Sequence, residues 1–214
     1  MYWDSFSQEM AARFVSEHLL DPEAFMTPLP LPSVSARDPL FRNAPENNWS
    51  GQCEGLTFQR ALWALERYGH EKTAVRIGRT FLDAVIRGGN RFTQQYDPFT
   101  GLPSRVGMRS HAPLAPDADE PAQDGYGPTV LAVLENIAAL WGIDLWMGEI
   151  RFSLGSALHP YRYVQEWGEK TYEIRSDGRR AKILIDGEVR YEVPCGIRVI
   201  TTPDGRLKRV RPLE

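Results

Sequence analysis

The hydrophobic pattern of this chain changes its period near residue 145, and that change constrains the fold more than any other feature. Before it, apolar residues recur every three or four positions, which is typical of amphipathic helices. After it, apolar and polar residues alternate, which is typical of half-buried strands. We therefore expect a helical domain over residues 1–147 and an antiparallel β domain over 148–214, in a fold that is mainly α with a C-terminal β appendage.

Four segments carry the helical period, and cap or turn residues bound them. Ser5 is a candidate cap for the first helix, and Gly88-Gly89 ends the third. The short gap between the second and third helices predicts an antiparallel helical hairpin. The fourth is apolar nearly all round, so we expect it to be buried on most sides. The expected helices cover residues 5–20, 53–69, 71–87 and 128–142.

Three Asp-Gly pairs in the C-terminal part predict β-hairpins, because Asp-Gly between alternating apolar runs favours tight hairpin turns. Strand-like runs follow one another closely here, so we expect them to pair in order as a small antiparallel β meander. The pairs are Asp177-Gly178, Asp186-Gly187 and Asp204-Gly205, and the runs are 182–185, 189–193 and 197–200.

Charge and cysteine content exclude several classes of protein. The 25 basic and 28 acidic residues give a net charge of −3, unlike the basic surface of a nucleic-acid-binding protein. No apolar run is long enough to cross a bilayer and no signal peptide is visible, so we expect a cytoplasmic protein without a membrane partner. Cys53 and Cys195 lack metal-site spacing, and we expect neither a metal nor another cofactor.

The segment 46–55, ENNWSGQCEG, is the first candidate site. It gathers amides, an indole and carboxylates where a loop meets a helix, namely Asn48, Trp49, Gln52 and Glu54. Amides and carboxylates bind sugar hydroxyls, and an aromatic face stacks on a pyranose ring. A helix cap with acidic residues near the positive end of the helix dipole explains the same residues equally well.

A second cluster, QQYDPFTG at 94–101, places Gln94, Gln95, Tyr96 and Asp97 together, either in a site or in a β-turn with a packed tyrosine. Further on, we expect an acidic loop to be solvated rather than to bind calcium, because it lacks an EF-hand pattern. Its residues are Asp117, Asp119, Glu120 and Asp124.

Four segments in this order resemble the C-terminal half of the six-hairpin glycosidases, the group of trehalase, mannosylglycerate hydrolase and the processing α-glucosidases. They are FMTPLPLPSVSARD at 25–38, NNWSGQCE at 47–54, QYDPFTG at 95–101 and QDGYGPT at 123–129, and the strand GIRVITT at 196–202 adds to the likeness. The resemblance implies (α/α)-barrel helical hairpins forming a partial toroid.

The resemblance also implies inverting hydrolysis of an α-linked glycoside by two carboxyl groups. The family's base, a glutamate just before the Tyr-Asp-Pro turn, falls on Gln94, and its acid has no counterpart here. Gln94 and the nearest carboxylates, Glu54 and Asp97, are therefore the catalytic candidates. The sugar-binding candidates are Asn48, Trp49, Gln52, Gln95, Tyr96, Asp124 and Tyr126.

Three functions follow from these residues. The first is a glycoside hydrolase whose missing half comes from another chain or a second copy, and the second is a catalytically silent carbohydrate-binding relative. The third, a sugar epimerase or lyase, is disfavoured because the four histidines show no pairing. Because a half barrel would expose apolar helix faces, we expect a homo-oligomer or a missing N-terminal half as partner. The histidines are His18, His70, His111 and His159.

Overall fold

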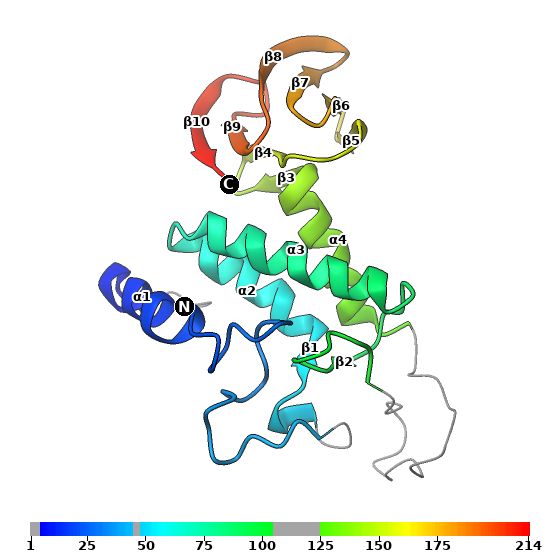
Figure 1. The fold of residues 1–214 in the computed structure, drawn as a ribbon. Coiled ribbons are helices and arrows are strands. Elements are labelled where there is room, and N and C mark those ends of the chain that lie inside the picture. The colour runs from blue at the N-terminus through cyan, green and yellow to red at the C-terminus, as the bar shows by residue number, and fades with distance from the viewer. Residues whose placement is uncertain (1–4, 45–47, 105–124) are drawn as a thin grey trace. The chain divides into compact units, whose positions relative to one another are not determined.

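The computed structural model describes residues 5–44, 48–104 and 125–214 (Figure 1). The chain divides into two compact units, Met1–Leu134 and Glu135–Glu214. The predicted division into domains after residue 147 stays a prediction. Among the described helices, none combines the length and apolarity that crossing a membrane requires.

The expectation of a mainly helical fold built as a partial (α/α) toroid is wrong. The described residues form four α-helices, together with ten strands in three antiparallel sheets. The alternating segment after residue 143 builds eight of those strands, because its runs extend well beyond the three that the Asp-Gly pairs mark. The prolines at 28, 30, 32 and 39 exclude a regular helix from the loop in which they lie.

The first helix is shorter than expected and changes its winding. Helix α1 covers Gln8–Phe14 and continues as a π-helix over Val15–Leu19. Ser7, rather than Ser5, caps it by accepting a hydrogen bond from the Met10 amide at 3.1 Å. The buried stripe is Ala11, Val15 and Leu19, whereas Met10 is 53% exposed.

Helices α2 (Gly55–Arg67) and α3 (Glu71–Arg87) form the predicted hairpin. Gly69 adopts φ +80°, a conformation that suits glycine, and its amide donates to the Glu66 carbonyl to close the turn. The rings of Phe58 and Phe81 stack with centroids 4.2 Å apart, which joins the two helices at their buried faces.

Helix α4 covers Gly127–Trp141 and runs from the first unit into the second. The expectation that it is buried on most sides is wrong. Leu131 and Leu134 are 46% and 59% exposed, and Ile137 is 36% exposed, whereas Ala132 and Leu140 are buried. The helix therefore buries one side and presents an apolar stripe on another.

The long proline-rich segment is an ordered loop where the structure describes it. Its end carries a 3-10 turn, Asn48–Ser50, and leads into the short strand β1, Cys53–Glu54. Strand β1 pairs antiparallel with β2, Gln95–Tyr96, which forms the two-stranded sheet of the first unit. Two loops that are far apart in sequence are thus joined beside the start of α2.

The second unit is a sandwich of two four-stranded antiparallel sheets. One sheet has the order β10-β9-β4-β3 and the other the order β5-β6-β7-β8. The strands are β3 (Ile143–Trp146), β4 (Glu149–Leu154), β5 (Tyr161–Trp167), β6 (Lys170–Ser176), β7 (Arg180–Ile185), β8 (Glu188–Pro194), β9 (Ile197–Thr201) and β10 (Leu207–Pro212).

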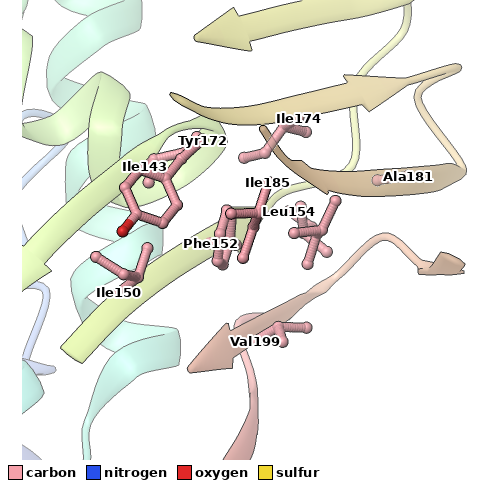
Figure 2. Packing of buried hydrophobic residues seen from close by; sticks show 10 residues of the cluster. Ile143, Ile150, Phe152, Leu154, Tyr172, Ile174, Ala181, Ile185 and Val199 are labelled. Atoms are coloured by element: carbon pink, nitrogen blue, oxygen red, sulfur yellow. The ribbon is translucent and has the colours of Figure 1, made fainter. Parts of the chain in front are cut away.

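Alternate residues of both sheets point into a common apolar core (Figure 2). Phe152 of β4 and Tyr172 and Ile174 of β6 are almost completely buried there, and the Tyr172 hydroxyl donates to the Pro203 carbonyl. The residues between them on each strand face outward. This alternation fixes which side chains of β5–β8 lie on the outer face of the sheet.

All three Asp-Gly pairs lie in hairpins, as predicted: they join β6 to β7, β7 to β8 and β9 to β10. The predicted meander is confirmed for β7 and β8 but wrong for β9, which pairs with β4 and β10. The chain changes sheets at Gly196, which adopts φ +87° and donates its amide to the Leu154 carbonyl.

Candidate functional site

The β1–β2 ladder brings two of the predicted site residues face to face. Glu54 pairs directly with Gln95, so both side chains point to the same side of the ladder. Glu54 is 4% exposed and Gln95 is 7% exposed. Among the described residues, Oε1 of Gln95 has no hydrogen-bond partner. An unpaired buried amide oxygen costs free energy, so this atom is an unsatisfied acceptor on the same side of the ladder as Glu54.

Gln94 joins the same cluster. Its Nε2 lies 3.5 Å from Oε1 of Glu54, at the outer limit of a hydrogen bond, and its carbonyl accepts from the Gly55 amide. The structure therefore brings together Glu54, Gln94 and Gln95, which the sequence placed in two separate loops. The side-chain amide of Gln94 thus points at a buried carboxylate.

The start of α4 closes one side of this cluster. Thr129 is fully buried and donates from its hydroxyl to the Thr93 carbonyl at 2.6 Å, and the Tyr126 amide donates to the Phe92 carbonyl at 2.7 Å. Burial and the negative charge of Glu54 together raise the pKa of the Tyr126 hydroxyl. The Tyr126 hydroxyl is protonated at neutral pH, as in any ordinary tyrosine, and lies near the charge of Glu54.

Asp97 has a different environment. Its Oδ1 accepts from the amides of Phe99 and Thr100, at 2.9 and 2.8 Å, and its Oδ2 accepts from Nδ2 of Asn43 at 2.8 Å. Burial opposes ionisation, but the hydrogen bond from the Thr100 amide and those from Asn43 and Phe99 lower the pKa of Asp97 on balance. This carboxylate organises its turn, and the structure does not pair it with Glu54.

Gln52 belongs to the network around Asp97 rather than to an open surface. It is fully buried, its amide donates to Oδ1 of Asn43 at 2.5 Å, and its Oε1 accepts from the hydroxyl of Ser104. No sequence motif indicated Asn43 or Ser104 as part of this network. Asn43 adopts a left-handed backbone, φ +46°, which asparagine tolerates better than most residues.

Tyr96 and Cys53 face the opposite side of the ladder and are fully buried. The Tyr96 hydroxyl donates to the Arg91 carbonyl at 2.8 Å, and its ring packs edge-on against Phe81. Burial raises the pKa of the Cys53 thiol well above its ordinary value, so this cysteine is a poor nucleophile. These positions favour packing for Tyr96, and its predicted sugar contact stays a prediction.

Trp49 is the one predicted binding residue with a broadly accessible ring, being 67% exposed. It lies in the 3-10 turn Asn48–Ser50, which precedes β1 in the chain. The Asn48 side chain, Asp124 and the acidic run at 117–120 lie outside the described residues. Within the described part of the chain, no three histidine, cysteine or acidic side chains gather closely enough to hold a metal ion.

A protein-family model matches most of the first unit. Residues 2–112 match the model of the mannosylglycerate hydrolase MGH1-like glycoside hydrolase domain, and this range includes β1, β2 and the Glu54 cluster apart from Tyr126 and Thr129. The chain belongs to the MGH1-like glycoside hydrolase family. No curated protein sequence gives a significant match.

The chain is also similar to solved structures, over different shares of its length. The GH63 mannosylglycerate hydrolase from Thermus thermophilus in complex with glucose has 22% identity and a TM-score of 0.45, over 63% of this chain and 28% of that one. The same enzyme with Tris and D-glycerate has 21% identity and a TM-score of 0.43, over 63% and 27%. This MGH1-like chain therefore spans about a quarter of those enzymes' length.

A structure named Sialidase covers 94% of this MGH1-like chain and 20% of its own, with 13% identity and a TM-score of 0.63. At that identity the likeness concerns the fold alone. It extends over both units, so the order of a helical unit followed by a β sandwich occurs in another protein.

Proposed function

We propose that this MGH1-like chain binds an α-linked glycoside at the cluster of Glu54, Gln94, Gln95 and Tyr126, and that the chain alone does not hydrolyse it. The observation that carries the proposal is the pairing of the Gln94 amide with the buried Glu54 carboxylate. The cluster offers a carboxylate, an unpaired amide oxygen and a protonated phenol, which together match the mixed donors and acceptors of a sugar.

The lack of turnover follows from the number of carboxylates. Inverting hydrolysis needs an acid and a base about 6.5–9.5 Å apart. Within the described cluster Glu54 is the single carboxylate, because position 94 is an amide and Asp97 is held in its own turn. Glutamine cannot take a proton from water as a carboxylate does. Loss of one member of the pair costs about 10²–10⁴-fold in rate.

The test is calorimetric titration of the purified chain with trehalose, maltose and α-mannosylglycerate, together with an assay for released monosaccharide. We expect saturable binding by at least one sugar, without hydrolysis. Glu54→Gln keeps the shape but removes the charge, and should weaken binding about tenfold. Thr80→Ala, on the exposed side of α3, is the matched control because its hydroxyl bonds only within its own helix. Absence of binding by all three sugars would overturn the proposal.

A second candidate function is hydrolysis by an assembly in which another polypeptide or a second copy supplies the missing acid. The exposed leucines of α4, Leu131 and Leu134, favour it, since a monomer seldom leaves an apolar helix stripe in water. Light scattering coupled to chromatography, followed by the hydrolysis assay on each peak, separates the two functions. Turnover confined to an oligomer supports the second candidate, and a stable monomer without turnover supports the first.

A further inference from the structure

The outer face of the β5–β8 sheet carries a row of basic side chains that the Glu54 cluster does not involve. Arg162 of β5 pairs with Arg175 of β6, and Arg175 pairs with Lys182 of β7. Directly paired residues point to the same face, and these three alternate with residues that enter the core. All three side chains are more than half exposed.

A buried carboxylate fixes the two arginines in place. Glu173, whose side chain is 6% exposed, accepts from Nε of Arg162 and from Nε and Nη2 of Arg175, the latter at 2.6 and 3.1 Å. Neither Nη group of Arg162 donates a hydrogen bond to the described residues. The same is true of Nη1 of Arg175. The guanidinium groups are thus held in position, with free donors left toward solvent.

The row is longer than a single anion can bridge. Adjacent strands lie about 4.8 Å apart, so Arg162 and Lys182 stand roughly 10 Å from each other across β6. Lys182 also contacts Glu192 at 3.7 Å, but this pair is about half exposed and holds the lysine only weakly. A ligand that fills the whole row must carry anionic groups at intervals.

We propose that Arg162, Arg175 and Lys182 form a binding surface for an acidic polysaccharide, whose regularly spaced anionic groups meet successive cations of the row. The choice of a saccharide rests on the glycoside hydrolase family that residues 2–112 of the same chain match. Three cations over about 10 Å form a far smaller basic surface than nucleic-acid-binding proteins usually carry, which disfavours nucleic acid. Sugar carboxylates and sulfates share the chemistry that arginine recognises.

The test is affinity electrophoresis of the full chain through gels that contain polygalacturonate, dextran sulfate or uncharged dextran. We expect retardation by an anionic polymer and none by dextran. The two anionic gels distinguish carboxylate from sulfate as the recognised group. Retardation should fall with added salt, because exposed charges are screened within about 10 Å at 0.1 M.

Two variants examine the row itself. Arg162→Gln leaves the Arg175–Glu173 pair intact, and Lys182→Gln removes only a weak surface pair, so both should fold and weaken retention about tenfold. Arg209→Gln is the matched control, since Arg209 also contacts a buried carboxylate, Glu149, but lies on β10 of the other sheet. It should retain the polymer normally.

Each other outcome overturns the proposal. No retention by either anionic polymer, or an equal loss in Arg209→Gln, would show that the row is no specific site. Tighter binding of a single-stranded oligonucleotide than of either polysaccharide would assign the surface to nucleic acid instead. Neutral-sugar binding at Glu54 is measured separately, so failure of one proposal is distinguishable from failure of the other.

Discussion

Gly55 begins helix α2 with its Cα directly against Thr129 of helix α4. A Cβ atom on Gly55 would lie 1.9 Å from Oγ1 of Thr129 and 2.8 Å from its Cα. Gly55 follows Glu54, and the Thr129 hydroxyl bonds the Thr93 carbonyl one residue before Gln94. The absence of a side chain at residue 55 therefore allows both halves of the candidate site to meet.

We expect Gly55→Ala to destabilise the first unit by about 1–3 kcal/mol, since overpacking against backbone atoms forces the helices apart. Alanine is the better helix former by about 1 kcal/mol, but that gain is smaller than the steric cost. Urea unfolding measures the difference in free energy. Gly127→Ala is the control, because no atom lies within 4 Å of a Cβ there. An equally stable Gly55→Ala chain would contradict the packing described.

How far the sequence predicted this molecule depends on the range of the interactions. The α2–α3 hairpin and the Asp-Gly hairpins depend on local signals, and those predictions are confirmed. The sheet change of β9 depends on pairing with β4, more than forty residues earlier in the chain, which no local pattern encodes. The expectation of a mainly helical fold was wrong because the alternating segment forms eight strands, many more than the three runs that the Asp-Gly pairs mark.

The site shows the same division. The residue types in the two loops predicted Glu54, Gln94 and Gln95 as site residues, but not that a two-residue ladder brings them together. Asp97 was predicted as a catalytic candidate because it is one of the carboxylates nearest to Gln94. The pairing of Asp97 with Asn43, which lies 54 residues away, could only be found in the folded chain.

Gln94→Glu should create a coupled pair of carboxylates beside α2. Two carboxylates within about 4 Å cannot both ionise easily, so the pKa of one rises in the folded chain. The free energy of unfolding then falls once the pH exceeds the pKa of this carboxyl in the unfolded chain. It continues to fall until the pH passes the raised pKa of the folded chain. The melting temperature relative to wild type should therefore fall between about pH 4 and pH 8. Gln94→Met, which is neutral, should show a pH-independent difference.

Asp97→Asn separates a turn role from a catalytic one. The side-chain oxygen of asparagine can still accept from the Phe99 and Thr100 amides. Its NH2 group, however, would face the NH2 group of Asn43, so we expect the free energy of unfolding to fall by about 1 kcal/mol. Asp97→Ala loses all three bonds and should cost about 1–3 kcal/mol. Sugar affinity measured by calorimetry should be unchanged in Asp97→Asn. A tenfold loss of affinity with normal stability would instead place Asp97 in the binding site.

The stability of the second unit should depend on pH through Glu173. Hydrogen bonds from Arg175 and then Arg162 lower the pKa of Glu173 from 4.5 to about 2. Because the folded pKa is depressed, the stabilisation is present above about pH 4.5 and is lost as the pH falls through about 2. Glu173→Gln should therefore be less stable than wild type at pH 7, and the difference should shrink toward pH 2. Hydrogen exchange of β6 amides measures it at each pH.

Glu192→Gln provides the comparison that decides the cause. Glu192 also faces a basic residue, Lys182, but at 3.7 Å and with its side chain 51% exposed, so water screens the pair. Its removal should change the exchange of β6 amides by no more than about 0.5 kcal/mol at any pH. If both variants lost stability equally at pH 7, the effect would belong to the net charge of the sheet rather than to the buried Glu173 carboxylate.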